Sequence, residues 1–145
     1  MTPPTTQAEA VIYYIREMDV DMIDLILDKD KSYQDMPKVV FIEKLTNAID
    51  VFKHNKNNKL IGYTGFCDSE ICPNNCKNGY SFIGNHSKHR MDIIFDVKNG
   101  NVQDVFECAD FMIFDKEINP NDYSRVYIDV PGEGFVSGLE SLFDF

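Results

Sequence analysis

Hydrophobic residues in the first third of the chain recur every three or four positions, which is the spacing of amphipathic helices. One such stretch spans residues 7–28. Asp19 is of a residue type that caps helix N-termini, so we expect it to split this stretch into two helices or to kink it. A third helix is expected to open at Asp35 and Pro37 and to end near His54. Its buried stripe consists of Phe41, Leu45, Ala48 and Phe52.

From residue 60 onward the apolar residues alternate with polar ones, which is typical of β-strands. Four antiparallel strands are expected, at residues 60–67, 79–85, 90–97 and 101–114. The chain beyond residue 114 is less regular. It contains a candidate strand at residues 124–130 and a candidate short helix after residue 137.

An Asn-Gly pair at residues 99–100 joins the last two of these four strands. Asn and Gly accept the positive φ angles of a type I′ turn, so we expect a two-residue hairpin loop that pairs Lys98 with Asn101. If no bulge intervenes, the same register places Phe95 opposite Asp104.

The length of 145 residues is close to the commonest domain size, and 43% hydrophobic residues suffice for one core. We therefore expect a single α+β domain over residues 1–145. Its parts are a helical region at residues 7–54, an antiparallel sheet at residues 60–114 and a C-terminal extension at residues 115–145.

Acidic residues outnumber basic ones, with 24 Asp and Glu against 14 Lys and Arg and a formal net charge of −10. The basic residues are scattered, so we expect no nucleic-acid partner and no membrane partner. No apolar run approaches the roughly 18 residues of a membrane span. The first residues lack the basic and apolar segments of a secretory signal, so the default expectation is a cytoplasmic location, with a periplasmic one left open.

Three cysteines lie within ten residues, in the loop after the first strand: Cys67, Cys72 and Cys76. In a reducing compartment such closely spaced thiols favour a structural zinc ion, and tetrahedral zinc needs a fourth ligand. The candidates are a nearby carboxylate such as Asp68 or Glu70, a water molecule, the C-terminal segment, or Cys108 if a bulge or bend brings it close. A disulfide within the trio and unpaired thiols are the alternatives. Cys108 lies in an apolar strand and is also typical of a small buried hydrophobic residue.

Three segments of the helical region resemble the nuclear transport factor two-like superfamily: residues 19–28, 32–37 and 40–45. They look like its second helix, its first-strand region and the start of its third helix. This cone-shaped α+β fold is shared by ketosteroid isomerases, polyketide cyclases and many non-catalytic domains. The resemblance covers residues 7–114 and implies three N-terminal helices packed on a curved antiparallel sheet of four or more strands, as in cystatin-like folds. It further implies a small-molecule pocket between helices and sheet, and often a homodimer.

The resemblance also suggests a role for Asp35. In the isomerase-type members of that superfamily, the matching segment carries an aspartate that abstracts a proton. A carboxylate in an apolar cone has its pKa raised into a useful range for a general base. An Asp two residues before Pro37 is more typical of a helix cap or a turn than of a catalytic base.

Three functions are therefore expected in turn. The first is a non-enzymatic domain whose cysteine loop holds zinc or a disulfide. The second is a small-molecule-binding protein or an isomerase-like or cyclase-like enzyme that uses Asp35. The third is a homodimeric interaction module.

Overall fold

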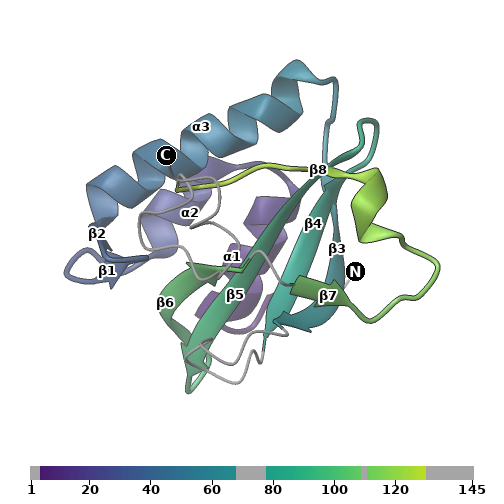
Figure 1. Cartoon of the computed structure of the whole chain (residues 1–145). Helices are drawn as coiled ribbons and strands as arrows, with labels where there is room; N and C mark the ends of the chain where they lie inside the picture. Colours follow the sequence, from purple (N-terminus) through teal and green to yellow (C-terminus); the bar gives the residue numbers. More distant parts are fainter. Residues whose placement is uncertain (1–3, 68–77, 109–110, 130–145) are drawn as a thin grey trace, which may run out of the picture.

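The computed structural model describes residues 4–67, 78–108 and 111–129, which form three α-helices and a large antiparallel sheet (Figure 1). The helices are α1 (Gln7–Arg16), α2 (Val20–Ile26) and α3 (Lys38–His54). The strands are β1 (Ser32–Tyr33), β2 (Met36–Pro37), β3 (Leu60–Cys67), β4 (Gly79–Gly84), β5 (His89–Lys98), β6 (Asn101–Glu107), β7 (Phe111–Ile113) and β8 (Ser124–Arg125), with a 3-10 turn at Pro120–Asp122. The expected α+β class is confirmed.

Asp19 divides the first helical stretch, as the sequence predicts. Its side chain accepts a hydrogen bond from the backbone N–H of Met22 at 3.2 Å and caps α2. The start of α3 differs from the expectation. Gln34 and Asp35 have φ angles of 55° and 59° and form the turn between β1 and β2, and the N-cap position of α3 is Pro37. The prediction that Asp35 opens the third helix is therefore wrong.

The hairpin between β5 and β6 is confirmed, because Lys98 pairs with Asn101. Asn99 and Gly100 at its tip both have positive φ angles, of 54° and 79°. A bulge between Asp96 and Val97 then shifts the register, so that Phe95 lies opposite Val105.

The side chain of Asp104 stabilises the strand beside this bulge. It accepts hydrogen bonds from the backbone N–H of Val105 at 2.7 Å and from that of Gln34 at 2.8 Å. The expected pairing of Phe95 with Asp104 is therefore displaced by one residue.

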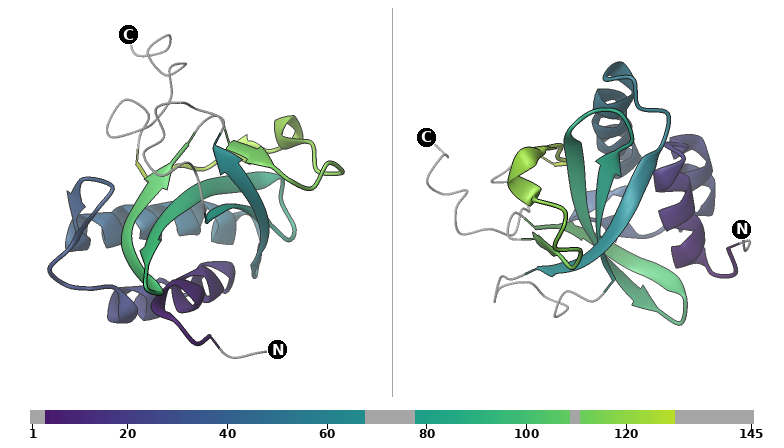
Figure 2. Two further views of the ribbon diagram at one scale, coloured as in Figure 1. Left: turned by 90° about the horizontal axis from the view of Figure 1, so that it is seen from below. Right: turned by 90° about the vertical axis from the view of Figure 1, so that its right-hand side faces the viewer.

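The expected strand at residues 101–114 is in fact two strands on opposite edges of the sheet. The strand order is β6-β5-β4-β3-β7, so β6 and β7 are separated by four strand spacings, about 19 Å in a flat sheet. Glu107 and Phe111 are only four residues apart, and such a segment spans at most about 14 Å. The sheet is therefore strongly curled, as Figure 2 shows.

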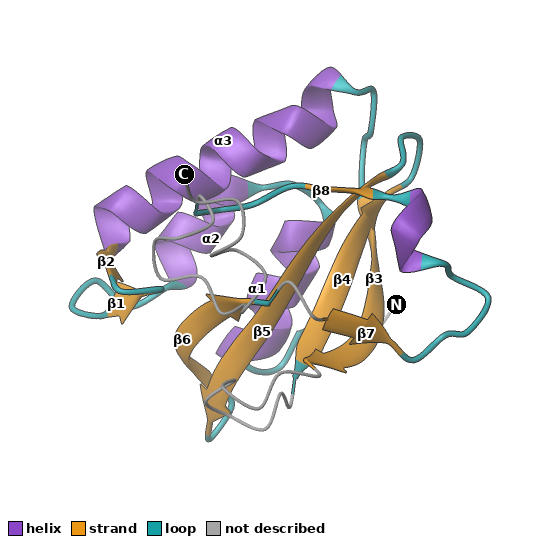
Figure 3. Cartoon of the chain, in the orientation of Figure 1, coloured by secondary structure: helices purple, strands orange, loops and turns teal. Residues whose placement is uncertain are grey.

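The main core lies between the three helices and one face of the sheet. Figure 3 shows α1 and α2 behind the sheet and α3 above it. Phe52 of α3, Phe82 of β4 and Phe95 of β5 are among its fully buried side chains. Because neighbouring strand residues point to opposite faces, Ile94 belongs to a second, smaller cluster, together with Cys108 and Phe111.

The ring of Phe111 fills the space above two paired glycines of this second face. A Cβ atom at Gly65 would lie 2.6 Å from the Phe111 ring, and one at Gly79 would lie 2.7 Å from it. Side chains larger than hydrogen are thus excluded where β7 crosses close to β3 and β4.

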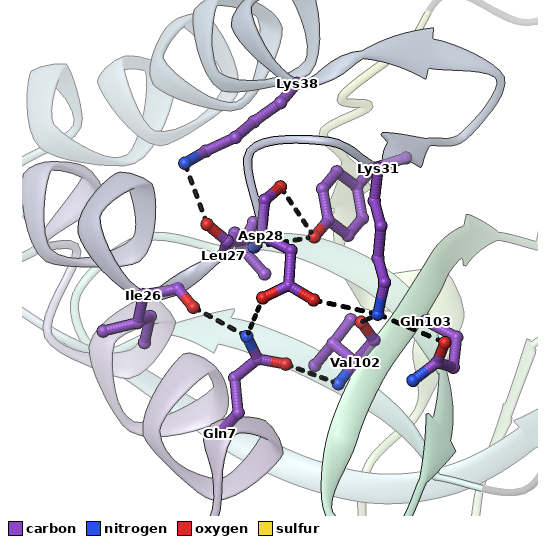
Figure 4. Close-up of polar contacts among 9 residues, drawn as sticks. Gln7, Ile26, Leu27, Asp28, Lys31, Lys38, Val102 and Gln103 are labelled. Atoms are coloured by element: carbon purple, nitrogen blue, oxygen red, sulfur yellow. Dashed lines mark hydrogen bonds and ion pairs between the residues drawn. The ribbon is translucent and has the colours of Figure 1, made fainter.

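A polar junction fastens the helical region to β6 (Figure 4). The Gln7 amide donates to the carbonyl oxygen of Ile26 at 2.7 Å and accepts from the N–H of Val102 at 2.7 Å. Lys31 forms an ion pair with Asp28 at 2.9 Å and reaches β6 as well.

We expect Gln7→Ala to lower the free energy of unfolding by about 1–3 kcal/mol, because it leaves a part-buried carbonyl and a strand N–H without their partner. Urea unfolding measures the loss. Gln103→Ala is the control, because it also truncates a glutamine but loses only a hydrogen bond from Lys31. It should cost less than about 1 kcal/mol. Equal losses in the two variants would contradict the role of this junction.

Within the described residues, no helix is long and apolar enough to cross a membrane. The candidate helix after residue 137 lies outside the described residues, and the candidate strand at residues 124–130 is described in part, as β8.

Candidate functional site

The residues from Ser124 to Asp129 form an extended segment, here called the strap, which runs between α3 and the sheet (Figure 1). Its first residues pair in parallel with β5, with Arg125 opposite Arg90, and the N–H of Val126 donates to the carbonyl of Arg90 at 2.7 Å. Val126 and Ile128 are buried in the main core. The strap therefore extends the sheet at the end of β5 that β6 does not reach.

A groove of about 570 Å³ lies between α3 and the strap. Such a volume is within the range of small-molecule sites. Its apolar lining is contributed by Ala48, Val51, Val126 and Ile128, and its polar lining by Lys44, Asn47, His89, Ser124, Arg125 and Tyr127.

The described residues that line this groove include no carboxylate, although the chain carries a net charge of −10. Two cations line it instead. Lys44 is held by Asp129 at 2.7 Å, and the Nε of Arg125 lies 3.4 Å from the carboxylate of Asp92. Because Asp92 and Asp129 are themselves almost fully buried, the cations are the more exposed partners of both pairs. The groove is thus locally suited to an anion.

A second groove, of about 530 Å³, lies beside the junction of α1 and α2 and has the opposite character. Its lining includes four carboxylates, Glu17, Asp19, Asp21 and Asp50, and one lysine, Lys53. Among the described residues no group of three or more His, Cys, Asp or Glu side chains is arranged to hold a metal ion.

A buried charge cluster lies beneath the strap. Arg90 and Asp92 are 4% and 6% exposed, and the Nε of Arg90 lies 3.5 Å from the Asp92 carboxylate. Burial raises the pKa of Asp92, and the charge of Arg90 opposes this shift. Both Asp92 oxygens and two nitrogens of Arg90 are buried without a hydrogen-bond partner, so the pair is held by charge and not by aligned hydrogen bonds.

Glu107, at the end of β6, binds the far end of the strap. Its Oε1 accepts from the N–H of Ile128 at 2.7 Å, and its Oε2 accepts from the N–H of Asp129 at 3.1 Å and from the Gln34 amide at 2.8 Å. Burial raises the pKa of Glu107 to about 7, against the lowering effect of these three donors.

The predicted zinc ligands fall largely outside the described residues. Cys67 ends β3, but its side chain is not described, and Cys72, Cys76 and Asp68 lie outside the described ranges. Cys108 is 2% exposed and disulfide-bonded. A disulfide sulfur is not a thiolate, so Cys108 does not serve as the fourth zinc ligand in this structure.

Asp35 is exposed at the tip of the β1–β2 turn and lines neither of the two grooves. Its role as a general base stays a prediction.

No match to this chain was found among protein-family models, curated proteins or solved structures. The resemblance to the nuclear transport factor two-like superfamily therefore remains a prediction.

Sequence reasoning missed Glu107, Asp92 and Arg125 as site residues. A signal was present for the first two. Glu107 lies between Phe106 and Cys108 in an apolar strand, and Asp92 lies between two residues that are fully buried. Charged residues are rarely buried unless paired, so such positions point to partners elsewhere in the chain. The sequence has no comparable signal for Arg125, because Arg125 follows a polar residue, Ser124, and does not interrupt an apolar run.

Proposed function

We propose that this chain is a non-enzymatic binding domain that takes up a small carboxylate with an apolar chain in the groove between α3 and the strap. One observation supports this function above the others: a groove without carboxylates and with two anchored cations, in a strongly acidic chain. The carboxylate of the ligand would approach Lys44 and Arg125, and its apolar chain would lie along Ala48 and Val51.

The curvature of the sheet and the order of helices and strands support a further proposal, that the fold is the cone-shaped one of the nuclear transport factor two-like superfamily. A pocket between helices and sheet is what that resemblance implies. Homodimer formation, a zinc ion in the cysteine loop and catalysis by Asp35 stay predictions beside this one.

Calorimetric titration with octanoate tests the proposed function, with octanamide as the uncharged probe of the same length. We expect saturable binding of octanoate and markedly weaker binding of octanamide. Asn47→Asp changes the groove lining without changing its shape and places a negative charge there. A charge about 4 Å from the ligand in water-like surroundings costs about 1 kcal/mol, which corresponds to a loss of affinity of about fivefold.

Val39→Asp is the matched control, because Val39 is 75% exposed on the same helix and does not line the groove. It makes the chain more acidic by the same amount and should leave the affinity for octanoate nearly unchanged. Equal losses in the two variants would assign the effect to net charge. Octanoate that binds no better than octanamide would refute the proposed function.

A further inference from the structure

Among the described residues, the side chain of Glu107 holds the backbone at the far end of the strap. At the near end, backbone pairing with β5 holds Ser124 and Val126. Further along, the N–H groups of Ile128 and Asp129 donate to the two carboxylate oxygens of Glu107. Glu107 is 2% exposed, so its protonation state acts directly on this end of the strap.

The protonated form of Glu107 needs a hydrogen-bond acceptor for its new O–H group. The N–H groups of Ile128 and Asp129 are donors and cannot accept it. Gln34 is the suitable neighbour. In the structure its Nε2 donates to Glu107 at 2.8 Å, whereas its own Oε1 is buried without a partner. A half-turn of this amide would present Oε1 to the protonated carboxyl group.

We propose that Glu107 and Gln34 form a proton-controlled latch, which holds the strap closed when Glu107 is neutral and loosens it when Glu107 is ionised. A proton taken from solvent binds Oε2 of Glu107, and the O–H group donates to the turned amide of Gln34. Ile128 and Asp129 keep their acceptors in this state, and Glu107 itself carries no buried charge. Because the strap is one wall of the groove, the latch would also regulate ligand binding, a consequence that rests on the proposed function.

The direction of this effect follows from linkage. With the strap closed the pKa of Glu107 is raised to about 7, and in an open strap it returns toward its ordinary 4.5 in water. The closed state therefore binds the proton more tightly. As the pH rises from about 4.5 through about 7, the closed state loses this advantage, which changes the open-to-closed ratio by between about two and three orders of magnitude.

Other charged groups surround the latch from each neighbouring element. Asp92, Arg125 and the phenol group of Tyr127 line the same small cavity as Glu107, and Asp129 lies on the strap beside it. Asp104 on β6 contacts Gln34, Lys44 on α3 pairs with Asp129, and Asp35 follows Gln34 in the chain. Asp129 raises the pKa of Glu107 by like-charge repulsion, and Lys44 neutralises part of that charge. Asp104 has a raised pKa as well, through burial, and it accepts from the N–H of Gln34.

Hydrogen exchange of the Ile128 and Asp129 amides between pH 5 and pH 8, corrected for intrinsic exchange, tests the latch without any ligand. We expect protection to fall by at least tenfold between pH 5 and about pH 7 and to level off above pH 7. Glu107→Gln is neutral at every pH and should remove this dependence. Asp104→Asn removes the other raised acid on β6 and should leave the dependence in place.

Gln34→Met keeps the side-chain volume and removes the acceptor that the neutral Glu107 needs, so protection at pH 5 should fall even if Glu107→Gln folds poorly. Protection that does not change with pH in the unmodified chain, or that changes equally in Glu107→Gln, would overturn the latch. Titration with octanoate at pH 5 and at pH 8 measures ligand binding separately from the exchange of the strap amides. Lack of binding at either pH would refute the groove function and leave the exchange result to decide on the latch.

Discussion

Replacing Asp92 by alanine is expected to lower the free energy of unfolding by about 3–5 kcal/mol, because it leaves the buried guanidinium of Arg90 without its counter-charge. Arg125 loses its carboxylate partner in the same variant. Asp24→Ala is the matched control. It removes the same side chain from an ion pair with Lys38 in which the carboxylate is 55% exposed, and it should cost no more than about 1 kcal/mol.

The double variant Arg90→Met with Asp92→Leu separates an unpaired charge from a simple loss of packing. Substituting both members of a buried pair by apolar residues of similar size is often neutral, so most of the stability should return. Chemical unfolding of the four proteins measures the comparison. A double variant as unstable as Asp92→Ala would show that the pair itself, and not the isolated Arg90 charge, maintains this part of the sheet.

Reduction of the disulfide at Cys108 is the second large effect, and we expect it to cost about 2–4 kcal/mol. The chain has four cysteines, so a thiol titration of unreduced, denatured protein should find at most two free thiols per chain when the bond is internal. The melting temperature should fall on addition of reductant. In Cys108→Ala it should already be low and should not respond to reductant.

Four titratable thiols and a chelator-removable metal in unreduced protein would contradict the disulfide and restore zinc as the leading hypothesis for Cys67, Cys72 and Cys76. A thiol titration that confirms the disulfide would favour an oxidising compartment over the cytoplasmic location expected by default.

Local signals in the sequence predict much of the fold. Asp19 and the Asn-Gly turn act through hydrogen bonds and φ angles within a few residues, and both predictions are confirmed. The end of α3 at His54 is also as expected. The prediction that Asp35 opens the third helix is wrong, and the alternative of a turn residue is confirmed, because two adjacent residues with positive φ favour a hairpin over a helix cap.

The candidate site is less predictable because its residues meet only in three dimensions. Glu107 and Ile128 are far apart in sequence and belong to no common motif. The bulge beside Asp96 and the break between β6 and β7 both depend on contacts with distant strands. Alternation of apolar residues continues across such a break, so the pattern from residue 101 to residue 114 predicts one strand where there are two.

The position of β7 also has a consequence for the order in which the chain folds. Neighbouring strands among β3, β4, β5 and β6 are consecutive in sequence and form a meander. β7, in contrast, follows β6 in sequence but pairs with β3, with Ile113 opposite Gly65. Closing that long loop has the larger entropic cost, so the meander should form in the transition state and β7 should dock afterwards. Destabilising substitutions in β7 should then accelerate unfolding and leave the folding rate nearly unchanged.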